Sequence, residues 1–95
     1  MIKVIAKNFI KMNQVDNFEQ SAIQLIEETR KEEGNISYAL YEDINNKQIL
    51  TFIEEWENEE ALNKHMNSVH FKRIVPEFNK FQERESEINI YRVRI

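Results

Sequence analysis

The sequence predicts an α+β domain in which helices cover one face of an antiparallel sheet. Segments that alternate apolar and polar residues with a period of two are typical of strands, and longer segments with apolar residues at helical spacing lie between them. The predicted order is strand, helix, strand, strand, helix, strand, which is the split βαβ arrangement of ferredoxin-like domains. At 95 residues, the chain is expected to form a single domain over 1–95.

The first strand is expected over residues 2–10, where Ile2, Val4 and Ile10 share one face. Asn8 lies on that same apolar face. A buried side-chain amide without a partner costs about 1–3 kcal/mol. Asn8 therefore either bonds to neighbouring backbone or faces an oxygen of a ligand.

The first helix is expected over about residues 16–33, since apolar residues recur there at helical spacing. Asp16 followed by Glu19 is a capping pattern that predicts where the helix starts. Gly34, the only glycine, is placed to end the helix in a left-handed conformation.

A hairpin is predicted next, with strands over residues 36–43 and 48–56 joined by a turn at 45–47. These strands are apolar or aromatic on both faces. Because the helices can cover only one face, the other is expected to meet a partner. Two copies of the chain that close sheet to sheet would satisfy it.

The second helical region is expected to start with Asn58 as its cap and to restart at Ser68. Pro76, the only proline, should kink that second piece or start its last turn. Alternation resumes over residues 86–95, which predicts the final strand.

Composition excludes several classes of function. The net charge is −4 and basic residues are scattered, which argues against nucleic-acid binding. With no cysteine there is no disulfide, thiolate site or thiol nucleophile, and a reducing cytoplasm is the expected location. One glycine cannot form a phosphate-binding loop, and lysines interrupt the N-terminal apolar residues, which excludes a membrane span there.

Three side chains are candidates for a site, and each also has a structural explanation. His65 shares a helix face with Ala61 and Val69, so it is either a hydrogen-bonded core histidine or a group that moves a proton. Trp56, at a strand end, is either core filling or a flat surface for an aromatic ligand. Asn8 is the third.

The sequence does not predict a metal centre. His65 and His70 lie about 140° apart around an unbroken helix, and no third ligand is apparent from the sequence. Glu54 and Glu55 point to opposite faces of their strand, so they are not a catalytic carboxylate pair.

Residues 34–43, GNISYALYED, and 52–72, FIEEWENEEALNKHMNSVHFK, resemble the antibiotic biosynthesis monooxygenase family, in particular its small quinol-monooxygenase-like members. The pattern is a glycine and polar residue before an aromatic strand, a strand ending Glu-x-Trp, a helical histidine and a Ser-x-His-Phe segment. The matching positions are Gly34, Asn35, Tyr38, Glu54, Trp56, Ala61, Leu62, His65, Ser68, His70 and Phe71.

The resemblance implies a homodimeric α+β barrel with a pocket in each subunit between sheet and helices. It implies oxidation of a quinol or phenolic aromatic by O₂ without a cofactor or metal. It also implies that His65 handles a proton or orients the substrate, that Asn8 holds a ring oxygen and that Trp56 stacks on the ring. Tyr38, Phe71 and Phe52 would be pocket walls.

Two alternatives remain open from the sequence. Haem-degrading relatives also carry an asparagine on the first strand, but their iron-binding histidine lies further along than His70. The other alternative is a dimeric barrel that binds a small ligand without catalysis, since a fold does not by itself deliver a function.

Overall fold

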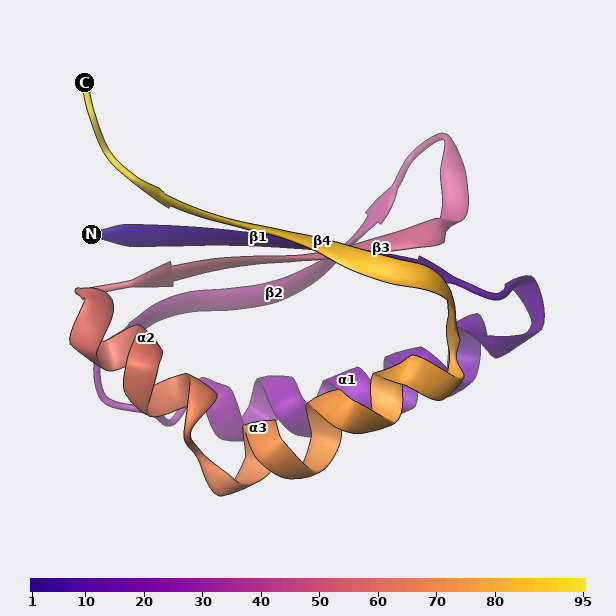
Figure 1. Cartoon of the computed structure of the whole chain (residues 1–95), viewed down its shortest axis with the longest axis horizontal. Helices are drawn as coiled ribbons and strands as arrows, with labels where there is room; N and C mark the ends of the chain where they lie inside the picture. Colours follow the sequence, from indigo (N-terminus) through magenta and orange to yellow (C-terminus); the bar gives the residue numbers. More distant parts are fainter.

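The computed structural model describes all 95 residues, and its four strands form one antiparallel sheet in the order β2-β3-β1-β4. Figure 1 shows the helices together on one face of this sheet. The ferredoxin-like α+β fold is therefore confirmed. The elements are β1 (Ile2–Ile10), η1 (Met12–Gln14), α1 (Val15–Thr29), β2 (Asn35–Asp43), β3 (Asn46–Trp56), α2 (Glu59–Met66), α3 (Val69–Ile74), η2 (Val75–Lys80) and β4 (Gln82–Arg92).

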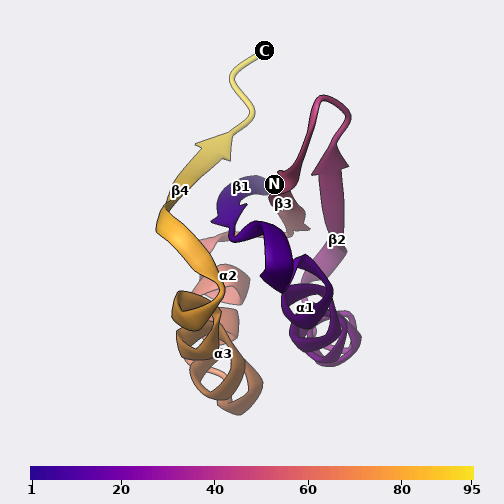
Figure 2. The same cartoon turned by 90° about the vertical axis from the view of Figure 1, so that its right-hand side faces the viewer.

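The face of the sheet beneath the helices carries the core. Alternate residues of β1 and β3 point to this face and are buried, including polar Asn8 and Glu54 among the apolar side chains. In Figure 2, α1 lies under the β2 side of the sheet and α3 under the β4 side.

Helix α1 differs from its predicted bounds at both ends. It begins at Val15 without a side-chain cap, and Asp16 lies in its first turn instead of capping it. It ends at Thr29, because Lys31 and Glu32 then donate backbone hydrogen bonds to carbonyls three residues back and tighten the chain into turns. These turns bring Glu32 back toward α2 and α3.

Gly34 does have a positive φ of 87°, but it lies beyond those turns and directly before β2, so it does not end the helix. A Cβ atom at this position would lie 2.6 Å from Cβ of Ala61 in α2. Glycine is therefore required both by backbone conformation and by the close approach of α2.

The second helical region follows the prediction. The side chain of Asn58 accepts a hydrogen bond from the backbone N–H of Ala61 at 2.9 Å and caps α2. The Ser68 hydroxyl accepts from the backbone N–H of Phe71 and caps α3. Pro76 lies in the first turn of η2, where its missing N–H costs nothing.

The other two predicted boundaries shift slightly. The hairpin turn consists of Ile44 and Asn45, and Asn46 already belongs to β3. Strand β4 begins at Gln82, four residues before the predicted start, and ends at Arg92. The earlier start places Gln82 opposite Ile10, next to Asn8.

The second face of the sheet carries no helix (Figure 2). Ile5 pairs with Ile53, which pairs with Ala39, and these three side chains form the half-buried centre of this outer face. Tyr41 and Tyr91 are about half exposed there. None of the helices has the length and apolar character needed to cross a membrane.

Candidate functional site

A cavity of about 150 Å³ lies between the inner face of the sheet and the helices. Most of its wall is apolar, and the side chains of Phe52, Phe71 and Phe78 are part of it. A cavity of similar volume in another protein holds one benzene molecule. This cavity is therefore suited to a single six-membered ring.

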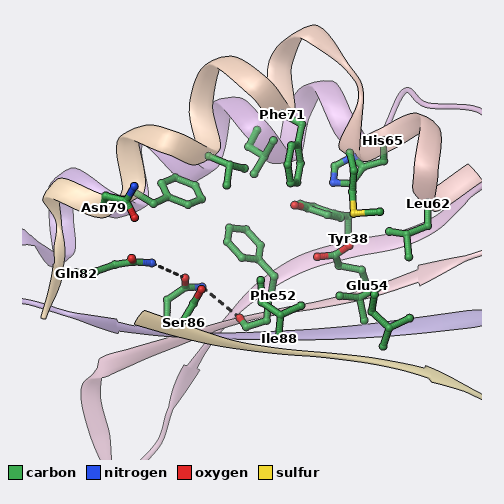
Figure 3. A pocket seen from close by; sticks show the side chains of 18 residues that line it. Tyr38, Phe52, Glu54, Leu62, His65, Phe71, Asn79, Gln82, Ser86 and Ile88 are labelled. Atoms are coloured by element: carbon green, nitrogen blue, oxygen red, sulfur yellow. Dashed lines mark hydrogen bonds between the residues drawn. The ribbon is translucent and has the colours of Figure 1, made fainter. Parts of the chain in front are cut away.

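Polar side chains gather at the two ends of this cavity, as Figure 3 shows. Tyr38, Glu54 and His65 lie at one end, and Asn79 and Gln82 at the other. Asn8 and Ser86 also line it. A flat ring with polar substituents would thus meet polar groups at its ends and apolar walls along its faces.

His65 is almost completely buried, with 1% of its surface exposed. Its Nδ1 lies 2.7 Å from Oε2 of Glu32. Because a carboxylate only accepts hydrogen bonds, Nδ1 carries the proton and Nε2 is left as a bare acceptor. That Nε2 is buried without any hydrogen-bond partner, in a residue that lines the cavity.

The surroundings of the His65 ring favour its neutral form. Three aromatic rings surround it, with centroid distances of 4.6 Å to Trp56, 5.4 Å to Tyr38 and 5.0 Å to Phe71. Burial lowers the pKa of His65, and the nearby Glu32 carboxylate opposes part of that effect. The protein without a ligand therefore presents a neutral imidazole whose lone pair is available to a ligand.

His70 reaches the same carboxylate oxygen, since its Nε2 lies 2.7 Å from Oε2 of Glu32. The expectation that no third ligand accompanies the two histidines is therefore wrong. The 140° separation assumed one continuous helix, whereas the chain has a break at Ser68 between α2 and α3. Glu32 has no local sequence signal, because only the turns after α1 bring it to the histidines.

Glu54 is the ionisable group at the cavity that the sequence reasoning set aside. It is 5% exposed, and its Oε1 accepts a hydrogen bond from the indole N–H of Trp56 at 3.0 Å. Burial raises the pKa of Glu54 to about 7, and the Trp56 hydrogen bond offsets part of that rise. The alternation of β3, which places Glu54 on the same face as Phe52 and Trp56, was the signal for it.

Trp56 does not line the cavity. It is fully buried, so its ring has no face open to a ligand in this structure. It contacts two side chains that do line the cavity, through its hydrogen bond to Glu54 and its ring contact with His65. Its position thus fits support of these two groups, not the stacking on a ligand that was expected.

Asn8 lines the cavity, but its amide already has partners. Its Nδ2 donates to the carbonyl oxygens of Ala6 and Leu50 at 3.2 Å, and its Oδ1 accepts from Gln82 at 3.1 Å. The structural explanation for this residue is therefore sufficient. No free N–H of Asn8 remains to hold a ring oxygen.

Tyr38, Phe52 and Phe71, the three predicted wall residues, all line the cavity. The Tyr38 and Phe52 rings contact each other, with centroids 5.5 Å apart. Burial, followed by the nearby Glu54 and Glu32 carboxyl groups, raises the pKa of the Tyr38 hydroxyl far above its usual range. Tyr38 therefore stays neutral at any pH at which the protein would work.

Comparison with known proteins agrees with the order of elements and the residue pattern. The family model described as antibiotic biosynthesis monooxygenase matches residues 1–77, most of the chain. The chain belongs to the antibiotic biosynthesis monooxygenase family.

Two solved structures in this fold are closely similar. A conserved protein from Methanosarcina mazei Go1 is 46% identical, with a TM-score of 0.97 over 98% of this chain and 92% of its own. A structure described as an antibiotic biosynthesis monooxygenase is 34% identical, with a TM-score of 0.94 over the full length of both chains.

Among curated relatives, the Synechocystis sp. (strain ATCC 27184 / PCC 6803 / Kazusa) protein sll1783, described as uncharacterized, is 32% identical over 91 residues. The match covers 95% of this chain but only 62% of that relative. The family is thus shown by the family model, and the 34% identical structure bears the same description, whereas none of these matches identifies a substrate.

The haem-degrading branch of the family fits this site poorly. A porphyrin is several times larger than the single ring that a cavity of about 150 Å³ holds.

Proposed function

We propose that this family member is a cofactor-independent monooxygenase that oxidises a single-ring quinol or phenol with O₂. The observation that carries the proposal is the buried, unpartnered Nε2 of His65 at the polar end of an aromatic-walled cavity. A buried acceptor without a partner costs about 1–3 kcal/mol, which a ligand hydroxyl would recover. The cavity volume sets the size of that ligand to one ring.

The first step is transfer of the phenolic proton to Nε2 of His65. Glu32, hydrogen-bonded to Nδ1, holds the imidazole in the required tautomer and stabilises the imidazolium that forms, as the acid of a catalytic triad does. The phenolate becomes electron-rich enough to reduce O₂, so the substrate itself supplies the electrons.

The oxidation balances with O₂ as the only co-reactant. One oxygen atom enters the ring at a C–H carbon, which becomes a quinone carbonyl when the substrate is a phenol and carries a hydroxyl group when it is a quinol. The other oxygen atom leaves as water with two hydrogens of the substrate: the C–H and O–H hydrogens of a phenol, or two of the three released by a quinol, whose third stays on the new hydroxyl. A phenol thus gives a quinone, and a quinol gives a hydroxyquinone.

Glu54 acts in its protonated form in this proposal. The cavity is lined by no lysine or arginine, so a donor to a developing oxyanion at this end is a neutral group, and protonated Glu54 lies there with the neutral Tyr38 hydroxyl. A carboxyl group kept neutral by its apolar site plays this part in other enzymes. The raised pKa of Glu54, about 7, leaves much of it protonated at neutral pH.

We also propose a homodimer that forms through the outer face of the sheet. The half-buried centre of that face, Ile5, Ile53 and Ala39, has no helix over it. Such an apolar sheet face is a surface that usually meets a partner. A second copy packed sheet to sheet gives the barrel that the family resemblance implies.

An oxygen electrode tests the enzymatic proposal directly. Protein freed of flavin and metal, in the presence of a chelator, is offered a panel of substituted phenols and hydroquinones. We expect O₂ consumption above the spontaneous rate, and a loss of roughly 10²–10⁴-fold in His65→Ala.

The matched control is Lys64→Ala, which changes the exposed neighbour of His65 on α2 and should leave the rate unchanged. If the wild-type protein accelerates no substrate, the non-catalytic ligand-binding alternative is favoured. Equal rates in His65→Ala and the wild type would remove His65 from the mechanism.

A further inference from the structure

Glu32, His65 and His70 form a cluster next to the cavity, on its outer side. Their ligand-type atoms, one carboxylate oxygen and two imidazole nitrogens, lie within 4.8 Å of one another. They come from three separate places in the chain: the turn after α1, the last turn of α2 and the first turn of α3. The proposed oxidation uses Nε2 of His65 and the hydrogen bond from its Nδ1 to Glu32, and it gives His70 no part.

We propose that Glu32, His65 and His70 bind one divalent transition-metal ion, of which Zn²⁺ is the best fit. Two histidines and one glutamate are a ligand set that zinc adopts in enzymes, with a water molecule in the fourth position. The proposal does not depend on the proposed oxidation, because binding of the ion is measured by itself.

The ligand atoms would shift by different amounts to hold the ion. With bonds of about 2.0–2.1 Å in a tetrahedral site, neighbouring ligand atoms lie about 3.3 Å apart. Glu32 Oε2 lies 2.7 Å from each imidazole nitrogen. Each of these two pairs would therefore open by about 0.6 Å, and the two imidazole nitrogens, which lie within 4.8 Å of each other, would come to about 3.3 Å. These shifts fall on side chains in a turn and at the ends of two helices.

The cluster can be reached from solvent. The side chains of Glu32 and His70 are each 16% exposed, whereas His65 behind them is 1% exposed. An ion would thus enter from the Glu32 and His70 side and keep a water ligand there. The aromatic rings around His65 exclude water from the opposite side of the site.

Metal binding would change the side of His65 that faces the cavity. At present the proton on Nδ1 lies between the imidazole and Glu32. The ion takes the place of that proton, and a neutral imidazole then carries its proton on Nε2. The cavity-facing nitrogen is converted from an acceptor to a donor, so the ion would block proton transfer from a phenol.

A Zn²⁺ titration tests the site. Metal-free protein competes with a chromophoric chelator for Zn²⁺, and we expect one ion per chain with a dissociation constant of about 1 μM or tighter. His70→Gln and Glu32→Gln should each weaken binding by about 100-fold, because even outer-shell partners of metals contribute roughly 10–100-fold.

Glu33→Gln is the matched control, since it removes the same charge one residue away on an exposed side chain. It should bind Zn²⁺ as the wild type does. Binding that is no weaker in His70→Gln, or that falls equally in Glu33→Gln, would overturn the proposal.

Two measurements on the wild-type protein keep the test decisive if a variant folds poorly. Nitrogen-15 chemical shifts of His65 should report a change from the Nδ1–H to the Nε2–H tautomer on addition of Zn²⁺. Crystals soaked in Zn²⁺ should show anomalous scattering among the three ligand atoms. Unchanged His65 shifts, or an ion elsewhere only, would refute the site.

Discussion

Glu54 is the residue whose ionisation should control activity near neutral pH. Its pKa is raised to about 7 by burial, and the proposal uses its protonated form as a donor. We therefore expect catalysis above the spontaneous rate to decline as pH rises through about 7. Glu54→Gln, which keeps a donor and cannot ionise, should lose that decline; rate profiles from pH 5.5 to 8.5 would show it. If the rate of Glu54→Gln also declines with rising pH and with the same midpoint, a group other than Glu54 causes the decline.

The same residue makes stability depend on pH. In the unfolded chain Glu54 ionises near 4.5, and in the folded protein near 7, so the folded state binds more protons between these values. The free energy of unfolding should therefore fall as pH rises from 4.5 to 7, by about 3 kcal/mol from this group. Urea unfolding at pH 5 and pH 8, compared between the wild type and Glu54→Gln, isolates the contribution. A difference of the opposite sign would contradict the burial of the carboxyl group.

Trp56 should act through Glu54. Its indole N–H is the only hydrogen-bond donor to the buried Glu54 carboxyl group, and this bond lowers the pKa of that group. Trp56→Phe keeps an aromatic ring but removes the donor, so the midpoint of the pH–rate profile should move upward. If the midpoint stays in place while the rate falls, Trp56 contributes only packing.

At the residue scale, the period-two alternation of the strands predicted the face of the sheet on which each candidate side chain lies. The chemistry of the single side chains did not predict their roles as well. Alternation placed Asn8, Glu54 and Trp56 on the inner face, where all three are buried. Alternation does not show how deeply a side chain is buried or which groups it forms hydrogen bonds with. It could not show that Asn8 is engaged by backbone carbonyls or that Trp56 lies behind the cavity wall.

At the scale of the elements, the turn between α1 and β2 positions the site. Gly34 has a φ of 87° and a Cβ there would lie 2.6 Å from Ala61, so Gly34→Ala should destabilise the fold by about 1–3 kcal/mol. Thermal or urea unfolding measures this loss. Asn45→Ala, in the exposed hairpin turn, is a comparison that should cost little. A Gly34→Ala variant as stable as the wild type would mean that this turn can rearrange.

The end of α1 also marks the limit of sequence-based prediction. Capping patterns and period-two alternation predicted the order of all strands and the starts of α2 and α3. The tightened turns after Thr29 have no comparable signal, because hydrogen bonds to carbonyls three residues back depend on how the chain must reach β2. Since those turns carry Glu32 to His65, the most informative contact of the site was not predictable.

At the scale of the whole molecule, the outer sheet face should hold two copies together. Sedimentation of the wild type should give twice the chain mass of 11.5 kDa. Ile53→Asp places a charge at the centre of the half-buried face and should give monomers. Ile44→Asp, at a turn residue that is 96% exposed, should remain dimeric. A monomeric wild type would contradict the proposed barrel.

The central claim is that the cavity receives an aromatic hydroxyl at its His65 end. A crystal structure with pentafluorophenol, which has no ring C–H to oxidise, tests this most directly. The account predicts the ring between Phe52 and Phe71, with its oxygen about 2.6–3.2 Å from Nε2 of His65. A ring bound outside the cavity, or with its oxygen at the Asn79 and Gln82 end, would contradict it.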